Sequence, residues 1–187
     1  NQILLESIYA FAKAVEARDH YTGRHSENMV SIVSEIGISL RLPSHEIDNL
    51  QHAAMLHDLG KIGIPDKILH KRKKLNRVEY DKIKKHPQIG AEIIRDIYIL
   101  REVIPMILHH HERYDGMGYS SGVKGKDIPL GARIVAIADV YQALISNRPY
   151  RKAYSKEDSL KIIHEGSGTQ FDPAIVDVFL QIMQGKK

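Results

Sequence analysis

Apolar side chains recur every three or four residues along most of the chain, which is the spacing of an amphipathic helix. The clearest case follows Pro129, where Leu130, Ile134, Ile137 and Tyr141 fall on one face. No stretch alternates apolar and polar residues with a period of two, and no segment repeats. The pattern therefore predicts an all-α fold, a single-domain helical bundle that spans residues 1–187.

Capping residues and prolines place the ends of these helices. Asn76 with Glu79, and Ser155 with Asp158, resemble capping boxes, and Asp172 stands before a first-turn proline. Helices are expected over residues 3–15, 23–40 or 26–40, 44–59, 76–86, 89–111 with a break or kink before Pro105, 129–148, from 155 onward and 174–183. Residues 61–75 form a polar connection, and the glycine-rich residues 112–127 form a surface loop, a common place for functional residues.

The composition restricts the class of protein. With 187 residues the chain can bury a core without covalent cross-links, and with no cysteine it has neither disulfides nor thiolate metal ligands. No apolar run reaches the roughly 18–20 residues that cross a bilayer, and there is no signal-peptide pattern. A cytoplasmic protein without a membrane partner is expected. The abrupt start inside a helix suggests excision from a longer protein with a covalently linked regulatory domain.

Eleven histidines accompany a formal net charge of +4, and several of them stand beside aspartates. His57-Asp58 ends an apolar helix, with Lys61 one turn later. Taken alone, this pair is more often a polar cap or a buried hydrogen-bonded pair than a metal site. Further metal-ligand types stand where helices are expected to end, at His25, His86 and the run His109-His110-His111.

Asp139 lies inside an apolar helical run, where an unpaired carboxylate is costly to bury. A salt bridge or a hydrogen bond to a histidine would satisfy it, but the other ligand candidates favour a metal. Nitrogen and oxygen donors without sulfur suit iron, manganese or another divalent transition metal. Two such ions about 3.5–4 Å apart can share a carboxylate and a hydroxide and hydrolyse a phosphodiester.

The motifs of the chain resemble those of the HD-GYP domains, a branch of the HD phosphohydrolase superfamily, over nearly the whole chain and in the same order. They are His57-Asp58-Leu59-Gly60-Lys61, Ile62-Gly63-Ile64-Pro65-Asp66, His86-Pro87, His110-His111-Glu112-Arg113, Asp115-Gly116-Met117-Gly118-Tyr119, Ile128-Pro129-Leu130, Ala138-Asp139-Val140, Arg148-Pro149-Tyr150-Arg151 and Phe171-Asp172-Pro173. The resemblance implies an HD-superfamily core and a phosphodiesterase that opens cyclic di-GMP to linear pGpG, and on to GMP in some members, by attack of a metal-bridging hydroxide.

The resemblance also assigns roles to individual residues. The implied metal ligands are His25, His57, Asp58, His86, His110, His111 and Asp139. Asp58 is expected to bridge two ions, and Lys61 to contact phosphate or assist the leaving oxygen, the alternative being a solvated helix-end cation. Tyr119, Arg148 and Arg151 match positions that hold the dinucleotide, the alternative being ordinary surface.

Four positions depart from the family pattern. Ser120 replaces the proline of the naming motif, which predicts a less rigid loop and weakens the case for binding a diguanylate cyclase domain. Tyr21 replaces the glutamate of members with a third metal, so two metals are expected. Gln142 and Ile145 replace an aspartate and a threonine, changes that can alter base preference or rate.

Other functions stay open from the sequence alone. A catalytically weak or silent cyclic-dinucleotide sensor would explain the altered tyrosine loop and Gln142. A phosphohydrolase for another nucleotide, such as cyclic GMP-AMP, would keep the same ligands. The basic run Lys71-Arg72-Lys73-Lys74 is interpreted as a solvated loop, because no nucleic-acid-binding motif accompanies it.

Overall fold

The computed structural model describes residues 2–18, 25–71, 73–147 and 151–185, and it confirms the predicted all-α fold: within these ranges there are helices and no strand. The α-helices are α1 (Gln2–Arg18), α2 (His25–Ser39), α3 (Ser44–Leu56), α4 (Asp66–Leu69), α5 (Arg77–Ile83), α6 (His86–Ile94), α7 (Ile104–His109), α8 (Leu130–Ile145), α9 (Lys156–Glu165) and α10 (Pro173–Gly185). Three short 3-10 helices lie between them, namely η1 (Leu59–Gly63), η2 (Tyr98–Leu100) and η3 (Gly125–Asp127).

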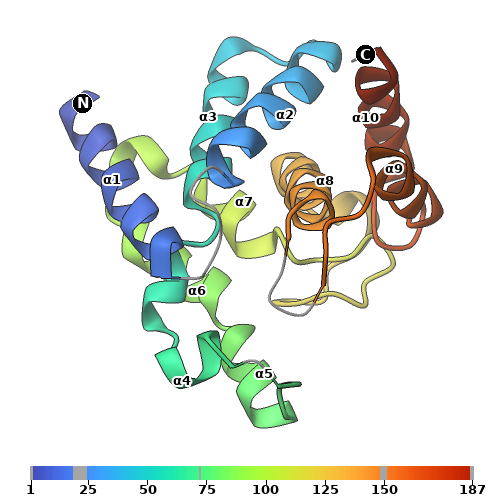
Figure 1. Ribbon diagram of the computed structural model, residues 1–187. Helices are drawn as coiled ribbons and strands as arrows, with labels where there is room; N and C mark the ends of the chain where they lie inside the picture. Colours follow the sequence, from blue (N-terminus) through green and yellow to red (C-terminus); the bar gives the residue numbers. More distant parts are fainter. Residues whose placement is uncertain (1, 19–24, 72, 148–150, 186–187) are drawn as a thin grey trace.

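Helix α8 forms the centre of the bundle. It packs against α2, α3, α7, α9 and α10, and it is apolar around most of its circumference, as a buried helix must be. Figure 1 shows α2 and α3 above it, α9 and α10 on one side and α6 with α4 and α5 below. The largest fully buried side chains of this core include Met29, Leu56, Ile107, Ile137 and Phe179. The core therefore lies where α2, α3, α7 and α10 pack around α8.

The predicted helix starts are present. Asn76 and Glu79 form a reciprocal capping box, with the Asn76 side chain accepting from the Glu79 N–H and the Glu79 carboxylate accepting from the Asn76 N–H, each at 2.9 Å. Ser155 caps α9 by accepting from the Asp158 N–H at 3.0 Å. At α10, the Asp172 carboxylate accepts from the Ala174 N–H at 3.0 Å. Local sequence signals therefore fix these ends.

Several boundaries differ from the prediction. Helix α3 ends at Leu56, not Leu59, because the chain tightens into η1 where Gly60 passes against α6. The expected 89–111 helix starts earlier, since Pro87 is accommodated in the first turn of α6, where no intrahelical N–H is needed. It then breaks between Ile94 and Ile104, as expected ahead of Pro105. The connection 61–75 contains the short helix α4, which the pattern did not indicate.

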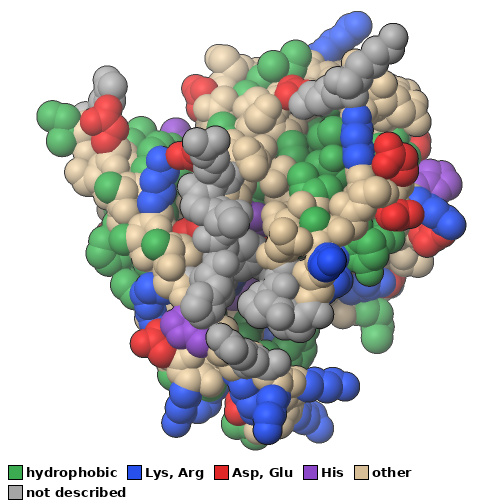
Figure 2. Space-filling view, viewed as in Figure 1, with side chains coloured by type: hydrophobic (Ala, Val, Ile, Leu, Met, Phe, Trp, Pro, Cys, Tyr) green, Lys and Arg blue, Asp and Glu red, His purple; other side chains and the backbone are tan. Residues whose placement is uncertain are grey.

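Lysine and arginine side chains gather at the end of the molecule where α4 and α5 lie (Figures 1 and 2). Of the predicted solvated basic run, Lys73 and Lys74 are exposed and Lys71 pairs with Glu79 at 2.6 Å. Arg72 lies outside the described residues. Among the helices of the four described ranges, none has the length and apolarity that crossing a membrane requires.

Candidate metal centre and adjoining pocket

Three of the predicted metal ligands are held in the same way. His57, His86 and His110 each use ring Nδ1 as a donor to the backbone carbonyl of the residue three positions earlier. The pairs are His57 with Ala54 at 2.9 Å, His86 with Ile83 at 2.8 Å and His110 with Ile107 at 2.6 Å. Each carbonyl belongs to the last turn of a helix, where it lacks an intrahelical partner.

This arrangement fixes the chemistry of each ring. A carbonyl oxygen only accepts, so the hydrogen must be on Nδ1, and in the neutral ring Nε2 then carries the lone pair. A donor bond from one ring nitrogen is the usual way to orient a metal-ligating histidine and to raise its basicity. Three helix ends thus direct the Nε2 lone pairs of His57, His86 and His110 toward the same cluster of side chains.

Asp58 lies between two of these rings. Its Oδ2 is 3.3 Å from His57 Nε2, and its Oδ1 is 3.5 Å from His86 Nε2. Lys61, one turn further along η1, donates from Nζ to Asp58 Oδ2 at 2.8 Å. One carboxylate therefore faces two separate groups of nitrogen donors, which is the position that a bridging ligand requires.

The other predicted ligands complete the two groups. Asp139 of α8 places Oδ1 3.4 Å from His25 Nε2 and 4.0 Å from His57 Nε2. His111 packs on the other side, with its ring centroid 4.0 Å from that of His110 and 5.0 Å from that of His86. Donor atoms within 4.8 Å of one another define one set as His25, His57 and Asp58 and another as His86, His110 and His111.

All seven sequence-predicted ligands are thus brought together, from residues that are up to 114 positions apart, and their role as ligands stays a prediction. The donor set fits divalent cations for two reasons. The donors are imidazole nitrogens and carboxylate oxygens with no sulfur. In addition, His57 Nε2 is buried without a well-formed hydrogen bond to any described residue, although Asp58 lies close by.

The electrostatics of the cluster separate its histidines. Burial lowers the pKa of His110 well below its usual range, and burial likewise lowers the pKa of His111 to about 4. Burial also lowers the pKa of His86. These rings are therefore neutral near pH 7, and neutral imidazole is the form that binds metals.

The half of the cluster that contains His57, Asp58 and Asp139 favours positive charge. Burial acts to lower the pKa of His57, but the carboxylates of Asp58 and Asp139 outweigh it and raise that pKa to about 9. Burial opposes ionisation of Asp58, yet Lys61 and His57 keep its pKa well below the usual range. The pKa of Asp139 is likewise lowered, against the effect of burial, by His25 and His57. Both carboxylates are charged at neutral pH, as metal ligands must be.

Two glycines let the backbones approach closely enough to form the site. A Cβ on Gly60 would lie 1.9 Å from the His86 carbonyl oxygen and 2.5 Å from the Gly90 nitrogen. A Cβ on Gly118 would lie 2.3 Å from the Arg113 nitrogen. The first contact brings η1, with Lys61, against the start of α6, and the second folds the glycine-rich loop back on itself.

The loop of residues 112–127 holds Tyr119 against the cluster, with its ring centroid 4.8 Å from that of His111. Burial raises the pKa of Tyr119, so its phenol stays neutral. Glu112, whose side chain is fully buried, accepts from the N–H groups of Ser121 at 2.5 Å and Gly122 at 3.0 Å. Ser120, which stands at the family's proline, donates from its hydroxyl to the Leu108 carbonyl at 2.9 Å.

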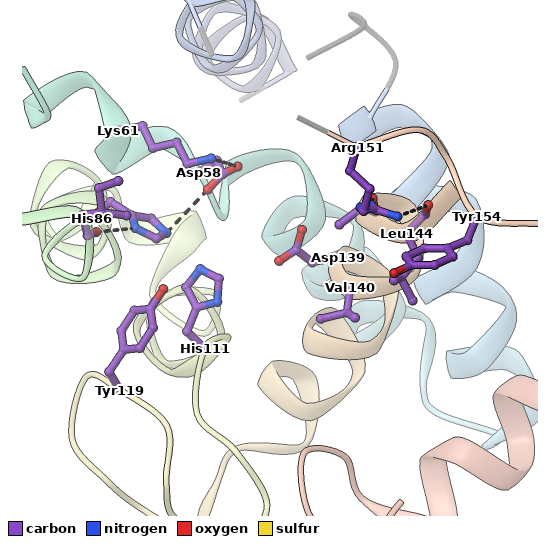
Figure 3. Close-up of a pocket in the computed structure, with 12 residues that line it drawn as sticks. Asp58, Lys61, His86, His111, Tyr119, Asp139, Val140, Leu144, Arg151 and Tyr154 are labelled. Carbon is purple, nitrogen blue, oxygen red and sulfur yellow. Dashed lines mark hydrogen bonds and ion pairs between the residues drawn. The ribbon is translucent and has the colours of Figure 1, made fainter. Parts of the chain in front are cut away.

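A pocket of about 470 Å³ opens beside the cluster (Figure 3). At one end Figure 3 shows Asp58, Lys61, His86, His111 and Tyr119, and at the other Val140, Leu144, Arg151 and Tyr154, with Asp139 between them. We call the first the ligand end and the second the α8 end. The ligand end carries charge and imidazole, whereas the α8 end is largely apolar and aromatic.

The predicted substrate residues have different placements. Lys61, Tyr119 and Arg151 line the pocket, and Arg148 lies outside the described residues. Tyr154 also lines the pocket, but the sequence analysis did not identify it. The one sequence signal for it is its position three residues after Arg151.

The positions that depart from the family pattern contribute differently. Gln142 is buried and accepts from the Asn28 side chain at 3.4 Å, and Ile145 packs on the core. Neither is among the residues that line the pocket. Tyr21, the expected sign that a third metal is missing, lies outside the described residues.

The described part of the chain is thus an all-helical domain in which helix ends bring imidazoles and carboxylates together. A family model described as "HD domain" matches residues 10–175. The chain belongs to the HD-domain family, and the family predicted from the motifs is thereby confirmed.

Relatives with curated names share most of the chain. The chain is 40% identical over 178 residues to the "Cyclic di-GMP phosphodiesterase response regulator RpfG" of Xanthomonas campestris pv. campestris, a match that covers 94% of this chain and 47% of that protein. It is 36% identical over 181 residues to the "3'3'-cGAMP-specific phosphodiesterase 2" of Vibrio cholerae, covering 94% of this chain and 34% of that protein. The chain thus spans half or less of the length of these relatives.

The crystal structure of a cyclic GMP-AMP specific phosphodiesterase of V. cholerae, V-cGAP3, has the same fold. It matches with a TM-score of 0.70 at 21% sequence identity, covering 95% of this chain and 49% of that chain. At this level of identity the likeness concerns the fold alone.

Proposed function

We propose that this domain is a metal-dependent phosphodiesterase that hydrolyses a cyclic dinucleotide. One observation carries the proposal: two sets of nitrogen donors face opposite oxygens of Asp58, next to Lys61, at the end of a pocket. A shared carboxylate between two donor sets suits a pair of cations, and a pair of cations suits phosphodiester hydrolysis.

We assign the cluster to two divalent ions, iron or manganese. His25, His57 and Asp139 would hold one, His86, His110 and His111 the other, and Asp58 would bridge them. When bound, such ions supply the Lewis acidity that activates water and neutralises charge on phosphoryl oxygens. The chain's contribution is to hold the donors in a fixed orientation, which the carbonyl bonds of His57, His86 and His110 accomplish.

Lys61 is the residue that acts on the leaving group in this proposal. Its side chain is only 13% exposed and its ammonium is held at 2.8 Å from Asp58, so it lies at the edge of the cluster facing the pocket. A charge in that position stabilises the alkoxide that departs from phosphorus, or donates a proton to it. Tyr119, neutral and packed on His111, provides a ring surface beside the same edge.

Cyclic di-GMP is the substrate we favour, with linear pGpG as the product and GMP as the alternative product. The names of the relatives support a cyclic dinucleotide, because RpfG carries the name of a cyclic di-GMP phosphodiesterase and the Vibrio relative that of a cGAMP-specific one. Cyclic GMP-AMP is therefore the second candidate. We also expect a covalently linked regulatory domain in the whole protein, and a cytoplasmic location, because a chain without cysteine suits a reducing compartment.

The test is turnover by protein loaded anaerobically with ferrous iron or manganese. Cyclic di-GMP, 3'3'-cGAMP and pGpG would each be incubated with the wild type and with Lys61→Met, and the products separated over time. We expect wild-type turnover of at least one cyclic dinucleotide and a loss of about a hundredfold in kcat for Lys61→Met with unchanged metal content. Binding of a cyclic dinucleotide without turnover under either metal would instead establish the sensor function.

A further inference from the structure

The α8 end of the pocket has a surface that could bind part of a nucleotide. The chemistry proposed for the ligand end does not use this surface. We propose that Tyr154, held by Arg151, is a stacking platform for a purine base of the nucleotide ligand. This inference deepens the proposed function and rests on it. It concerns where the base binds, whereas the proposed function concerns where the phosphate reacts.

The platform is fixed to the end of α8 at two points. The Tyr154 N–H donates to the Leu144 carbonyl at 3.0 Å. The Arg151 guanidinium carbon lies 4.3 Å from the centroid of the Tyr154 ring, while its Nη2 donates to the Ala143 carbonyl at 2.8 Å. A longer contact of 3.4 Å joins Arg151 Nη1 to the Leu144 carbonyl. Arginine thus satisfies helix-end carbonyls and at the same time orients the ring.

Arg151 is therefore a positioning residue in this proposal. Arg151 donates from both Nη1 and Nη2 to backbone carbonyls of α8, and the cation at the reacting end of the pocket is Lys61. Figure 3 shows this separation, with Arg151 and Tyr154 on one side of the pocket and Lys61 on the other.

The surface of the platform suits a base more than a phosphate. Tyr154 is 42% exposed and lines the pocket beside Val140 and Leu144, so ring area is left uncovered by Arg151. An aromatic face next to aliphatic side chains gains from stacking and burial of a planar ring, whereas the negative face of the ring does not attract an oxyanion. A nucleotide with its phosphate at Lys61 and its base at Tyr154 would use both ends of one pocket.

The test compares two ligands that differ only in the base. Dissociation constants for GMP and for ribose 5-phosphate would be measured by calorimetry, with manganese present throughout, for the wild type, Tyr154→Ala, Tyr154→Phe and Arg151→Lys. We expect Tyr154→Ala to weaken GMP about tenfold and to leave ribose 5-phosphate within about twofold. Tyr154→Phe keeps the ring and should bind GMP like the wild type. Arg151→Lys should weaken GMP by a smaller factor and leave ribose 5-phosphate unchanged.

A matched control exists elsewhere on the molecule. Tyr98 is 75% exposed with Arg101 4.7 Å from its ring centroid, the same pairing at a site that does not line the pocket. Tyr98→Ala should change neither dissociation constant. Thermal unfolding of each variant would verify that Tyr154→Ala is folded.

The outcomes separate this inference from the proposed function. If Tyr154→Ala binds GMP as tightly as the wild type, or loses both ligands equally, the base platform is overturned, and wild-type turnover of a cyclic dinucleotide still supports the enzyme. Absence of GMP binding by the wild type overturns the platform whatever the turnover. If ribose 5-phosphate is weakened by Arg151→Lys, Arg151 is a phosphate ligand and its positioning role is wrong.

Discussion

The two ends of the pocket are constructed differently. The ligand end adjoins the cluster of predicted metal ligands, which come from the ends of α2, α3, α6 and α7 and from the middle of α8. Most of these ligands are buried, and three are oriented by hydrogen bonds to helix-end carbonyls. At the α8 end, one helix and the segment after it contribute half-exposed side chains. The first arrangement fixes the positions of the predicted metal ligands. The second tolerates substitution, because its side chains are half-exposed. In the proposed function, chemistry and ligand preference are thus assigned to different parts of the structure.

The largest expected effect comes from removing the residue that joins the two donor sets. Asp58→Ala should lower kcat roughly a thousandfold, because bound cations contribute several kcal/mol of charge stabilisation. Metal content, measured by elemental analysis, should fall with it. Asp177→Ala, which removes an exposed carboxylate on α10, is the matched control and should change neither. Wild-type metal content in Asp58→Ala would contradict the assigned bridging position.

The next effect tests whether the ligand end depends on close backbone packing. Gly60→Ala places a methyl group against the backbone of α6, so we expect a loss in the free energy of unfolding at the upper end of about 1–3 kcal/mol, with weakened metal binding. Gly185→Ala is the control, since nothing lies within 4 Å of its Cβ position. Chemical denaturation would measure both. Equal stability of the two variants would refute the role given to the η1–α6 contact.

A smaller effect is expected where the loop that carries Tyr119 is anchored. Glu112→Ala leaves the N–H groups of Ser121 and Gly122 without their acceptor. Both residues are exposed, so water replaces the carboxylate and the net loss is about 0.5–1.5 kcal/mol for each hydrogen bond. We expect faster hydrogen exchange in residues 112–127 and a KM about tenfold higher. Glu112→Gln retains a carbonyl oxygen in the same place and should recover most of the loss. If Gln and Ala behave alike, the acceptor role is wrong.

The smallest effect concerns the serine that replaces the family's proline. Ser120→Ala removes one hydrogen bond to Leu108, worth about 0.5–1.5 kcal/mol. KM should rise by a smaller factor than in Glu112→Ala. The value of kcat should stay unchanged, because the Ser120 hydroxyl bonds to the Leu108 carbonyl and not to a predicted metal ligand. Steady-state kinetics would decide, and a large fall in kcat would show that the loop and the ligand end are not separate.

The ligand end could be predicted from the sequence because its polar residue types occur at positions where such residues are uncommon. An aspartate inside the apolar run of α8 and histidines at helix ends are conspicuous in a one-dimensional pattern, and the family resemblance joined them into one set. The bonds from Nδ1 to the carbonyls were not predicted, since they depend on how each helix ends. The early end of α3, at Leu56, is such a case.

The α8 end gave no comparable signal. Tyr154 is an exposed tyrosine in a polar segment, and its place in the pocket depends on Arg151 folding back onto α8. Glu112 likewise could not be identified as a loop anchor, because its partners are backbone groups whose position depends on the path of the loop. Side chains that act through the backbone of distant residues leave no periodic trace in the sequence.

The most direct test of the account is manganese titration of the metal-depleted protein, followed by electron paramagnetic resonance. The account predicts two equivalents of manganese for each chain and a spectrum of two magnetically coupled ions, because both donor sets share Asp58. Asp58→Ala should lose the coupling. Binding of one equivalent or none, or a spectrum of two isolated ions in the wild type, would contradict it.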